Sequence, residues 1–189
     1  GINRLSIGIQ SFCDAHLQLM NRRHIAEEAI QAVKVCREVG FENISIDLIY
    51  GIPGMKKNEW IGNVHTALSL KAEHISAYHL TIEEGTAFQS FLNQGIIKEE
   101  NEDVSFWQFS YLINELEKAG YEQYEISNFS LPGRRSRHNS SYWSGEKYLG
   151  IGPSAHSFDG SIRYWNINNI HAYIKHIRNG NSWYEFENI

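Results

Sequence analysis

The chain has 189 residues, of which 42% are hydrophobic and 21% charged, a composition typical of a folded globular protein with one sizeable core. The net charge of -5 argues against a general nucleic-acid binder, because contact with phosphates needs a concentrated basic surface. No apolar run approaches the roughly 18–20 residues of a transmembrane helix, and no signal peptide opens the chain.

The two cysteines, Cys13 and Cys36, are too few for a disulfide framework and too far apart for a C-x-x-C metal site. We therefore expect ordinary thiols in a protein of the reducing cytoplasm. The chain starts within a strand-like run without Met and stops within the acidic and apolar run YEFENI. From these ends we expect a part of a longer protein.

The first 84 residues alternate between predicted strands and predicted helices. The strands cover residues 4–12, 43–50 and 74–82, and the helices cover residues 24–39 and 58–70. Gly40 is well placed to end the first of these helices. This order predicts an α/β fold in which parallel strands are joined by right-handed crossovers.

The two faces of the predicted strands differ in polarity. One face of the first strand is aliphatic, whereas the opposite face of the first two strands carries small or polar residues, namely Ser6, Gly8, Gln10, Ser45 and Asp47. A doubly wound sheet is normally apolar on both faces, and a barrel that holds a polar ligand shows this asymmetry instead. We therefore predict part of a TIM-like barrel, with further strands before Gly1 and an open edge at the first strand.

The second half departs from this rhythm. We predict a long helix over residues 103–119, capped by Asp103, and a further helix over about residues 168–178. Between them lie the strand-like YEQYEISNF, a basic loop with RHNSSYW, the run YLGIGPSAHSF and a short RYWN. These features predict two domains: residues 1–84 as the barrel part and residues 85–189 as an α+β extension.

Three polar residues stand near the ends of the first two strands: Gln10, Arg22 and Asp47. Ligands of parallel α/β folds collect at the carboxyl ends of the strands, so these side chains are candidates for a ligand site. The alternative is structural: Asp47 pairs with an arginine or caps the turn that follows it. The residues alone leave both interpretations open.

Longer motifs extend this interpretation. They are GIQSF, NRRH, SIDLIYGIPG, HISAYHLTIEEGTAF, YEISNFSLPGRRSRHNSSYW and YLGIGPSAHS. In order and spacing, this series resembles the oxygen-independent coproporphyrinogen III oxidase-like family of radical SAM proteins, and most closely its haem chaperone branch. The resemblance covers nearly the whole chain. It implies the C-terminal half of a partial (β/α)6 radical SAM barrel, an α+β accessory region, and truncation before the family's C-terminal domain.

The resemblance also implies cofactors. Gln10, Arg22 and Asp47 match the positions that contact S-adenosylmethionine in the family. Arg22 offers a guanidinium suited to a carboxylate, while Gln10 and Asp47 offer amide and acceptor groups. The family's four-iron–four-sulfur cluster needs a C-x-x-x-C-x-x-C loop, which this chain lacks. We therefore expect the cluster's ligands outside this chain, and we expect the chain alone to be inactive as an enzyme.

The motif H-N-x-x-Y-W marks the chaperone branch and is associated there with haem. Its residues here are His138, Asn139, Tyr142 and Trp143. The His138 imidazole could serve as an axial ligand of haem iron, and the aromatic rings could pack on the porphyrin. The alternative is a structural histidine in a loop that Tyr142 and Trp143 anchor. His156 is a weaker candidate for the haem ligand. The basic residues Arg134, Arg135 and Arg137 either pair with propionates or form a solvated loop.

Three functions remain in competition at this stage. The first, which we favour, is a haem chaperone that binds haem and S-adenosylmethionine and passes haem to a recipient protein. The second is an oxygen-independent coproporphyrinogen III oxidase, which decarboxylates a porphyrinogen oxidatively in haem biosynthesis. The third is an unrelated barrel with a sugar-phosphate substrate. For the favoured function, the expected partners are haem or a porphyrinogen, a haem-recipient protein, and a membrane surface reached peripherally by the parent protein.

Overall fold

A five-stranded sheet organises the first of two compact units, residues 1–135, in the computed structural model, which describes residues 1–189. The order across the sheet is β1-β2-β3-β5-β4, with β1 parallel to β2, β2 parallel to β3, and both other pairs antiparallel. The strands are β1 (Leu5–Gln10), β2 (Ile44–Tyr50), β3 (His74–His79), β4 (Glu122–Gln123) and β5 (Asn128–Ser130). The predicted α/β fold with a parallel sheet is confirmed.

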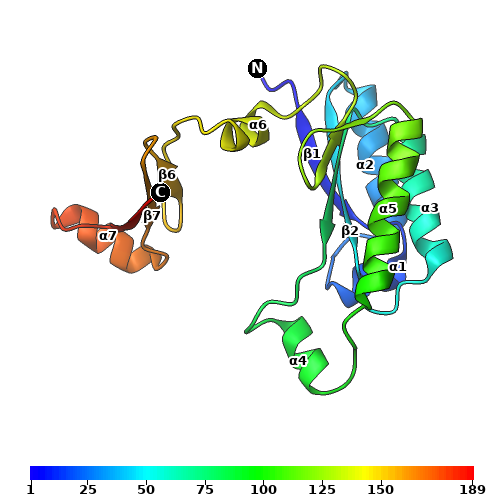
Figure 1. The fold of residues 1–189 in the computed structure, drawn as a ribbon, viewed down its shortest axis with the longest axis horizontal. Coiled ribbons are helices and arrows are strands. Elements are labelled where there is room, and N and C mark those ends of the chain that lie inside the picture. The colour runs from blue at the N-terminus through cyan, green and yellow to red at the C-terminus, as the bar shows by residue number, and fades with distance from the viewer. The chain divides into compact units, whose positions relative to one another are not determined.

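Five helices belong to the same unit: α1 (Asp14–Leu19), α2 (Ala26–Glu38), α3 (Lys57–Ser69), α4 (Ala87–Asn93) and α5 (Glu102–Lys118). The long helices α2, α3 and α5 lie together along one face of the sheet (Figure 1). The helical spacing of apolar residues predicted all three. It missed α1 and α4, which are too short to show a periodic apolar face.

Local signals define the ends of these helices. Gly40 follows α2 with φ +94°, a left-handed conformation that glycine adopts without steric cost, as predicted for a C-terminal cap. Asn101 caps α5, because its side-chain oxygen accepts the backbone N–H of Asp103 at 2.7 Å. The prediction that Asp103 caps this helix was therefore wrong: Asp103 supplies the N–H, and the acceptor lies two residues earlier.

The core lies between the helices and the sheet. Fully buried residues from the sheet and from the helices meet there, among them Ile46, Leu48, Trp60 and Leu112. The Trp60 indole N–H donates to the Gln108 carbonyl at 2.7 Å, which joins α3 to α5. The Gln108 side-chain oxygen in turn accepts the Gly51 backbone N–H at 2.7 Å, so α5 is also held to the end of β2.

The compact units divide the chain between Arg135 and Ser136. The sequence analysis instead divides it between residues 84 and 85, where the alternation of strands and helices stops. After that point, α5, β4 and β5 still join the first unit, because α5 contributes Leu112 and Leu116 to its core. The boundary at residue 84 remains a prediction about where the repeated pattern ends.

The open edge predicted at the first strand is present. β1 stands at one end of the strand order and pairs only with β2. Pairing loses its regular register between Ile7 and Gln10, at the carboxyl end of the strand. An edge strand of this kind presents unpaired backbone groups to a further strand.

The second unit, residues 136–189, contains a three-stranded antiparallel sheet of order β6-β7-β8. Its elements are α6 (Arg137–Trp143), β6 (His156–Phe158), β7 (Ile162–Asn166), α7 (Ile170–Arg178) and β8 (Tyr184–Asn188). RHNSSYW was predicted as a loop and forms α6 instead, because the Ser136 side chain accepts the Asn139 N–H at 3.3 Å and starts a helix. None of the helices in either unit is long and apolar enough to cross a membrane.

Candidate functional site

The sheet of the first unit has one face covered by helices and one polar face, on which Asp47 lies. Its neighbours in β2, Ile46 and Leu48, are fully buried in the core, so the alternation of side chains turns Asp47 to the other face. The Ser6 hydroxyl on the adjacent strand donates to Asp47 Oδ1 at 3.4 Å. Asp47 therefore faces the side that the barrel hypothesis assigns to a ligand.

Gln10 reaches the same polar face from the end of β1. Its backbone has φ +70°, a left-handed conformation that is uncommon outside glycine and is found preferentially at functional sites. Its side chain lies over Gly8, where a Cβ atom would stand 2.7 Å from Gln10 Nε2. A residue larger than glycine at position 8 would displace the amide, so Gly8 makes this orientation of Gln10 available.

Arg22 stands apart from the sheet. It lies in the exposed turn between α1 and α2, where its backbone N–H donates to the Leu17 carbonyl at 2.9 Å. Of the three residues predicted to bind S-adenosylmethionine, Gln10 and Asp47 thus share one face of the sheet, and Arg22 is carried by a neighbouring turn.

The environment of Asp47 determines its protonation. Burial raises the pKa of Asp47 above the ordinary carboxyl value, and hydrogen bonds from Ser76 and Ser6 and the charge of Arg4 oppose this only in part. The Arg4 guanidinium donates instead to Asn43 Oδ1 at 3.3 Å and to the Arg134 carbonyl at 3.1 Å. Asp47 is therefore not neutralised by a close ion pair, which leaves its carboxylate able to accept donors from a ligand.

A buried histidine, His74, joins two hydroxyl groups on the same polar face as Asp47. His74 is 1% exposed; its Nδ1 lies 2.8 Å from Ser45 Oγ and its Nε2 lies 2.7 Å from the Tyr124 hydroxyl. Burial, with the charge of Arg4, lowers the pKa of His74 to about 4, so the ring is neutral at pH 7. His74 was not among the residues singled out from the sequence, since its contact with Tyr124 spans 50 residues and leaves no local pattern.

A pocket of about 360 Å³ opens at the carboxyl ends of β2 and β3. His79 lines it and lies 3.0 Å, through Nε2, from Ser105 Oγ. Gly51 has φ +72°, and a Cβ atom there would come within 2.5 Å of the His79 ring. The glycine of the motif DLIYGIP thus lets the histidine pack against the backbone at the end of the sheet where ligands of parallel folds bind.

In the second unit, α6 displays the residues of the H-N-x-x-Y-W motif. His138 and Tyr142 are four residues apart on the helix, and their ring centroids lie 4.9 Å apart in an edge-to-face arrangement. Tyr142 also contacts Tyr148, with ring centroids 4.7 Å apart. Tyr142 is 49% exposed and Trp143 65% exposed, so this aromatic group is accessible to a flat apolar ligand.

The other predicted positions have different surroundings. Arg135 forms an ion pair with Glu122 at 2.9 Å, and its guanidinium lies 5.6 Å from the centroid of the Tyr124 ring. These contacts favour a structural role for Arg135. His156 starts β6 and packs near Trp165, with ring centroids 6.2 Å apart. Cys13 and Cys36 are free thiols on separate elements and, with no third cysteine, do not fit a four-iron–four-sulfur cluster.

Comparison with known proteins agrees with this fold and these motifs. Residues 1–67 match the family described as the Radical SAM superfamily. The chain is 38% identical over 174 residues to "Heme chaperone HemW" of Lactococcus lactis, an alignment that covers 92% of the chain and 46% of that protein. "Heme chaperone HemW" of Bacillus subtilis matches with the same identity and coverage. The chain thus spans about half the length of the curated relatives it matches.

A solved structure matches the whole chain. Its title is "Coproporphyrinogen III oxidase (HemN) from Escherichia coli is a Radical SAM enzyme", and the match has a TM-score of 0.79 at 23% sequence identity, covering 100% of this chain and 46% of that one. The match over residues 1–67 and the fold fit a radical SAM protein. The chain fits a fragment of a protein with the fold of the coproporphyrinogen III oxidase, as its motifs predicted, and its sequence is similar to the haem chaperones named above.

Replacing Asp47 should reveal the cost of placing its carboxylate on the sheet. Because burial raises the pKa of Asp47, the folded state disfavours the charged form, and this cost is present above the folded pKa. We expect Asp47→Asn to raise the free energy of unfolding at pH 7, measured by urea denaturation. The gain should shrink as the pH falls below the ordinary carboxyl pKa, where both states are protonated. A loss of stability at pH 7 would contradict this interpretation.

His74 should make the stability of the chain depend on acid. Its pKa is about 4 in the folded protein against an ordinary 6.5, so its contribution is complete above pH 6.5 and is lost as the pH falls toward 4. At about 1.4 kcal/mol per pKa unit, the loss is about 3 kcal/mol. Urea denaturation between pH 7 and 4 should show a steeper loss for the original chain than for His74→Gln. Parallel curves would contradict the prediction.

Proposed function

We propose that the parent protein is a haem chaperone of the radical SAM type, which binds haem and S-adenosylmethionine and delivers haem to a recipient protein. The observation that carries this proposal is the 38% identity, over 92% of the chain, to proteins named as haem chaperones. The likeness to the coproporphyrinogen oxidase, at 23% identity, concerns the fold alone and gives the oxidase alternative no comparable support.

For S-adenosylmethionine, the proposed ligands are Gln10, Arg22 and Asp47. The cofactor's amino-acid head, ribose and adenine offer donors and acceptors that can satisfy polar groups on the sheet. Asp47 has no close cationic partner, and Gln10 holds its amide over Gly8 on the same face. With an iron–sulfur cluster, S-adenosylmethionine supplies radical chemistry. We propose that the cysteines for this cluster lie in the parent protein outside this chain.

For haem, the proposed site is α6. The imidazole of His138 would serve as an axial ligand to the iron, and the exposed rings of Tyr142 and Trp143 would pack on the porphyrin. Arg137, exposed in the same helix, could pair with a propionate through a charge-assisted hydrogen bond. The placement of His138 and Tyr142 on one side of the helix supports this proposal, because both can face a single flat ligand.

The proposal extends to partners and location. A chaperone needs a recipient for its haem, and a recipient in the membrane would bring the parent protein to the membrane surface. We propose a cytoplasmic location, which the two free thiols fit because disulfides are rare in that compartment.

Titration with haem tests the proposed function. Binding to the 189-residue chain should shift the Soret band of haem, and the shift should saturate as the two are titrated against each other. His138→Ala should abolish the shift because it removes the axial ligand. His171→Ala is a matched control, since His171 is also an exposed histidine on a helix of the second unit. We expect this control to bind as the original chain does.

Two results would contradict the haem site. One is the absence of a saturable shift in the original chain. The other is equal haem binding by His138→Ala and His171→Ala, which would show that haem binds without preference for His138. Circular dichroism of each variant separates the loss of a ligand from the loss of α6.

A further inference from the structure

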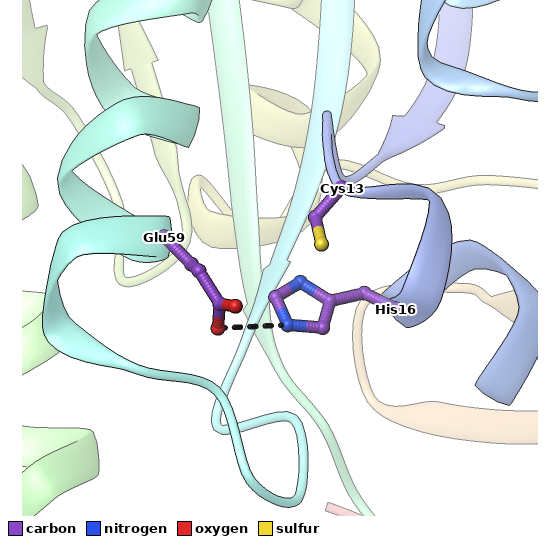
Figure 2. Close-up of side chains that lie close together, drawn as sticks. All are labelled: Cys13, His16 and Glu59. Carbon is purple, nitrogen blue, oxygen red and sulfur yellow. Dashed lines mark ion pairs between the residues drawn. The ribbon is translucent and has the colours of Figure 1, made fainter.

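A second group of chemically reactive side chains lies in the first unit, away from the polar face of the sheet. Figure 2 shows Cys13, His16 and Glu59 directed toward one another. Cys13 immediately precedes α1, His16 follows three positions later on that helix, and Glu59 belongs to the first turn of α3. One ligand atom from each of the three side chains lies within 4.8 Å of the other two.

The spacing suits a small cation. In a tetrahedral zinc site with bonds of about 2.0–2.3 Å, the ligand atoms stand roughly 3.3–3.8 Å apart. His16 Nε2 and Glu59 Oε2 are 3.4 Å apart, which already matches. The thiol lies within 4.8 Å of both other ligand atoms. It belongs to the residue just before α1, so a side-chain rotation that brings it closer would leave the helix intact.

The surroundings hold the imidazole in place. His16 Nδ1 lies 3.1 Å from Ser11 Oγ, which also receives the Asn63 side-chain N–H at 3.1 Å. Asn63 is fixed in turn, because its oxygen accepts the Phe12 backbone N–H at 2.8 Å. A hydrogen bond at one ring nitrogen orients metal-binding histidines in this way, and here it leaves Nε2, the nitrogen nearer to Glu59, for the metal.

The mixture of ligands selects the metal. A thiolate, an imidazole and a carboxylate suit zinc, whereas calcium and magnesium prefer oxygen atoms alone. His16 is only 6% exposed, so its imidazole is held within the protein beside Glu59. Glu59 Oε2 also accepts the Lys56 N–H at 2.7 Å, so the carboxylate is anchored at the start of α3.

We propose that Cys13, His16 and Glu59 form a zinc site with a fourth position open to water or to another ligand. Such a site would fasten α1 to α3 beside the carboxyl end of β1. The proposal is independent of the haem and S-adenosylmethionine sites, because none of its three residues belongs to either. The sequence analysis could not find it, since Glu59 lies far along the chain from the C-x-x-H pair.

Titration with cobalt(II), which takes the place of zinc and absorbs light, tests the site in the 189-residue chain. We expect a thiolate-to-cobalt charge-transfer band that zinc displaces. Cys13→Ser should abolish the band, and His16→Gln and Glu59→Gln should each weaken metal binding at least about tenfold, since even outer-shell changes cost 10- to 100-fold. Cys36→Ser is the matched control, because Cys36 is the other cysteine of the chain.

Cys13→Ser decides the outcome even if His16→Gln fails to fold. In the original chain, the Cys13 thiol forms no part of the Ser11–Asn63 hydrogen-bond network. The Cys13→Ser variant should therefore keep the circular dichroism spectrum of the original chain. Zinc should also raise the melting temperature of the original chain and of Cys36→Ser, but not of Cys13→Ser. The proposal would be overturned by the absence of a charge-transfer band, by its survival in Cys13→Ser, or by its loss in Cys36→Ser.

Discussion

The first unit depends on a sheet with parallel strands β1, β2 and β3, of which one face is apolar and the other polar. One face buries the aliphatic residues of β1, β2 and β3 beneath α2, α3 and α5, and this burial supplies the main stabilisation of the first unit. The other face carries Ser6, Asp47 and His74, which need hydrogen-bonding partners. A one-residue slip in the register of β2 would place Asp47 in the core, so the apolar packing itself enforces the position of the polar group.

The polar residues on the helix-free face differ in how fully they are hydrogen-bonded, and the proposed ligand site depends on this difference. His74 has a hydroxyl at each ring nitrogen, as a structural element of the sheet would. Asp47 has only weak donors and remains partly desolvated, while Gln10 adopts a left-handed backbone conformation beside it. A raised Asp47 pKa and a left-handed backbone at Gln10 coincide at two of the residues that we propose bind S-adenosylmethionine, and this combination is expected where a ligand completes a site.

Short-range patterns in the sequence predicted much of this fold. The two-residue period of β1 and β2 predicted which face holds Asp47, and the helical period predicted α2, α3 and α5. By contrast, α6 was missed because its seven residues, Arg137–Trp143, show no apolar stripe and depend on one cap at Ser136. Contacts between distant residues were also out of reach: Tyr124 meets His74, and Glu59 meets His16, only after the sheet and helices have assembled.

The central claim is that the helix-free face of the sheet binds S-adenosylmethionine, and nuclear magnetic resonance tests it most directly. S-adenosylmethionine would be added to the isotopically labelled chain, and the change in each backbone amide shift would be recorded. The account predicts saturable changes centred on Gly8, Gln10 and Asp47, with little change at residues of the covering helices, such as Val33 in α2. Saturable changes confined to the helical layer or to residues 136–189, or no change at all, would contradict it.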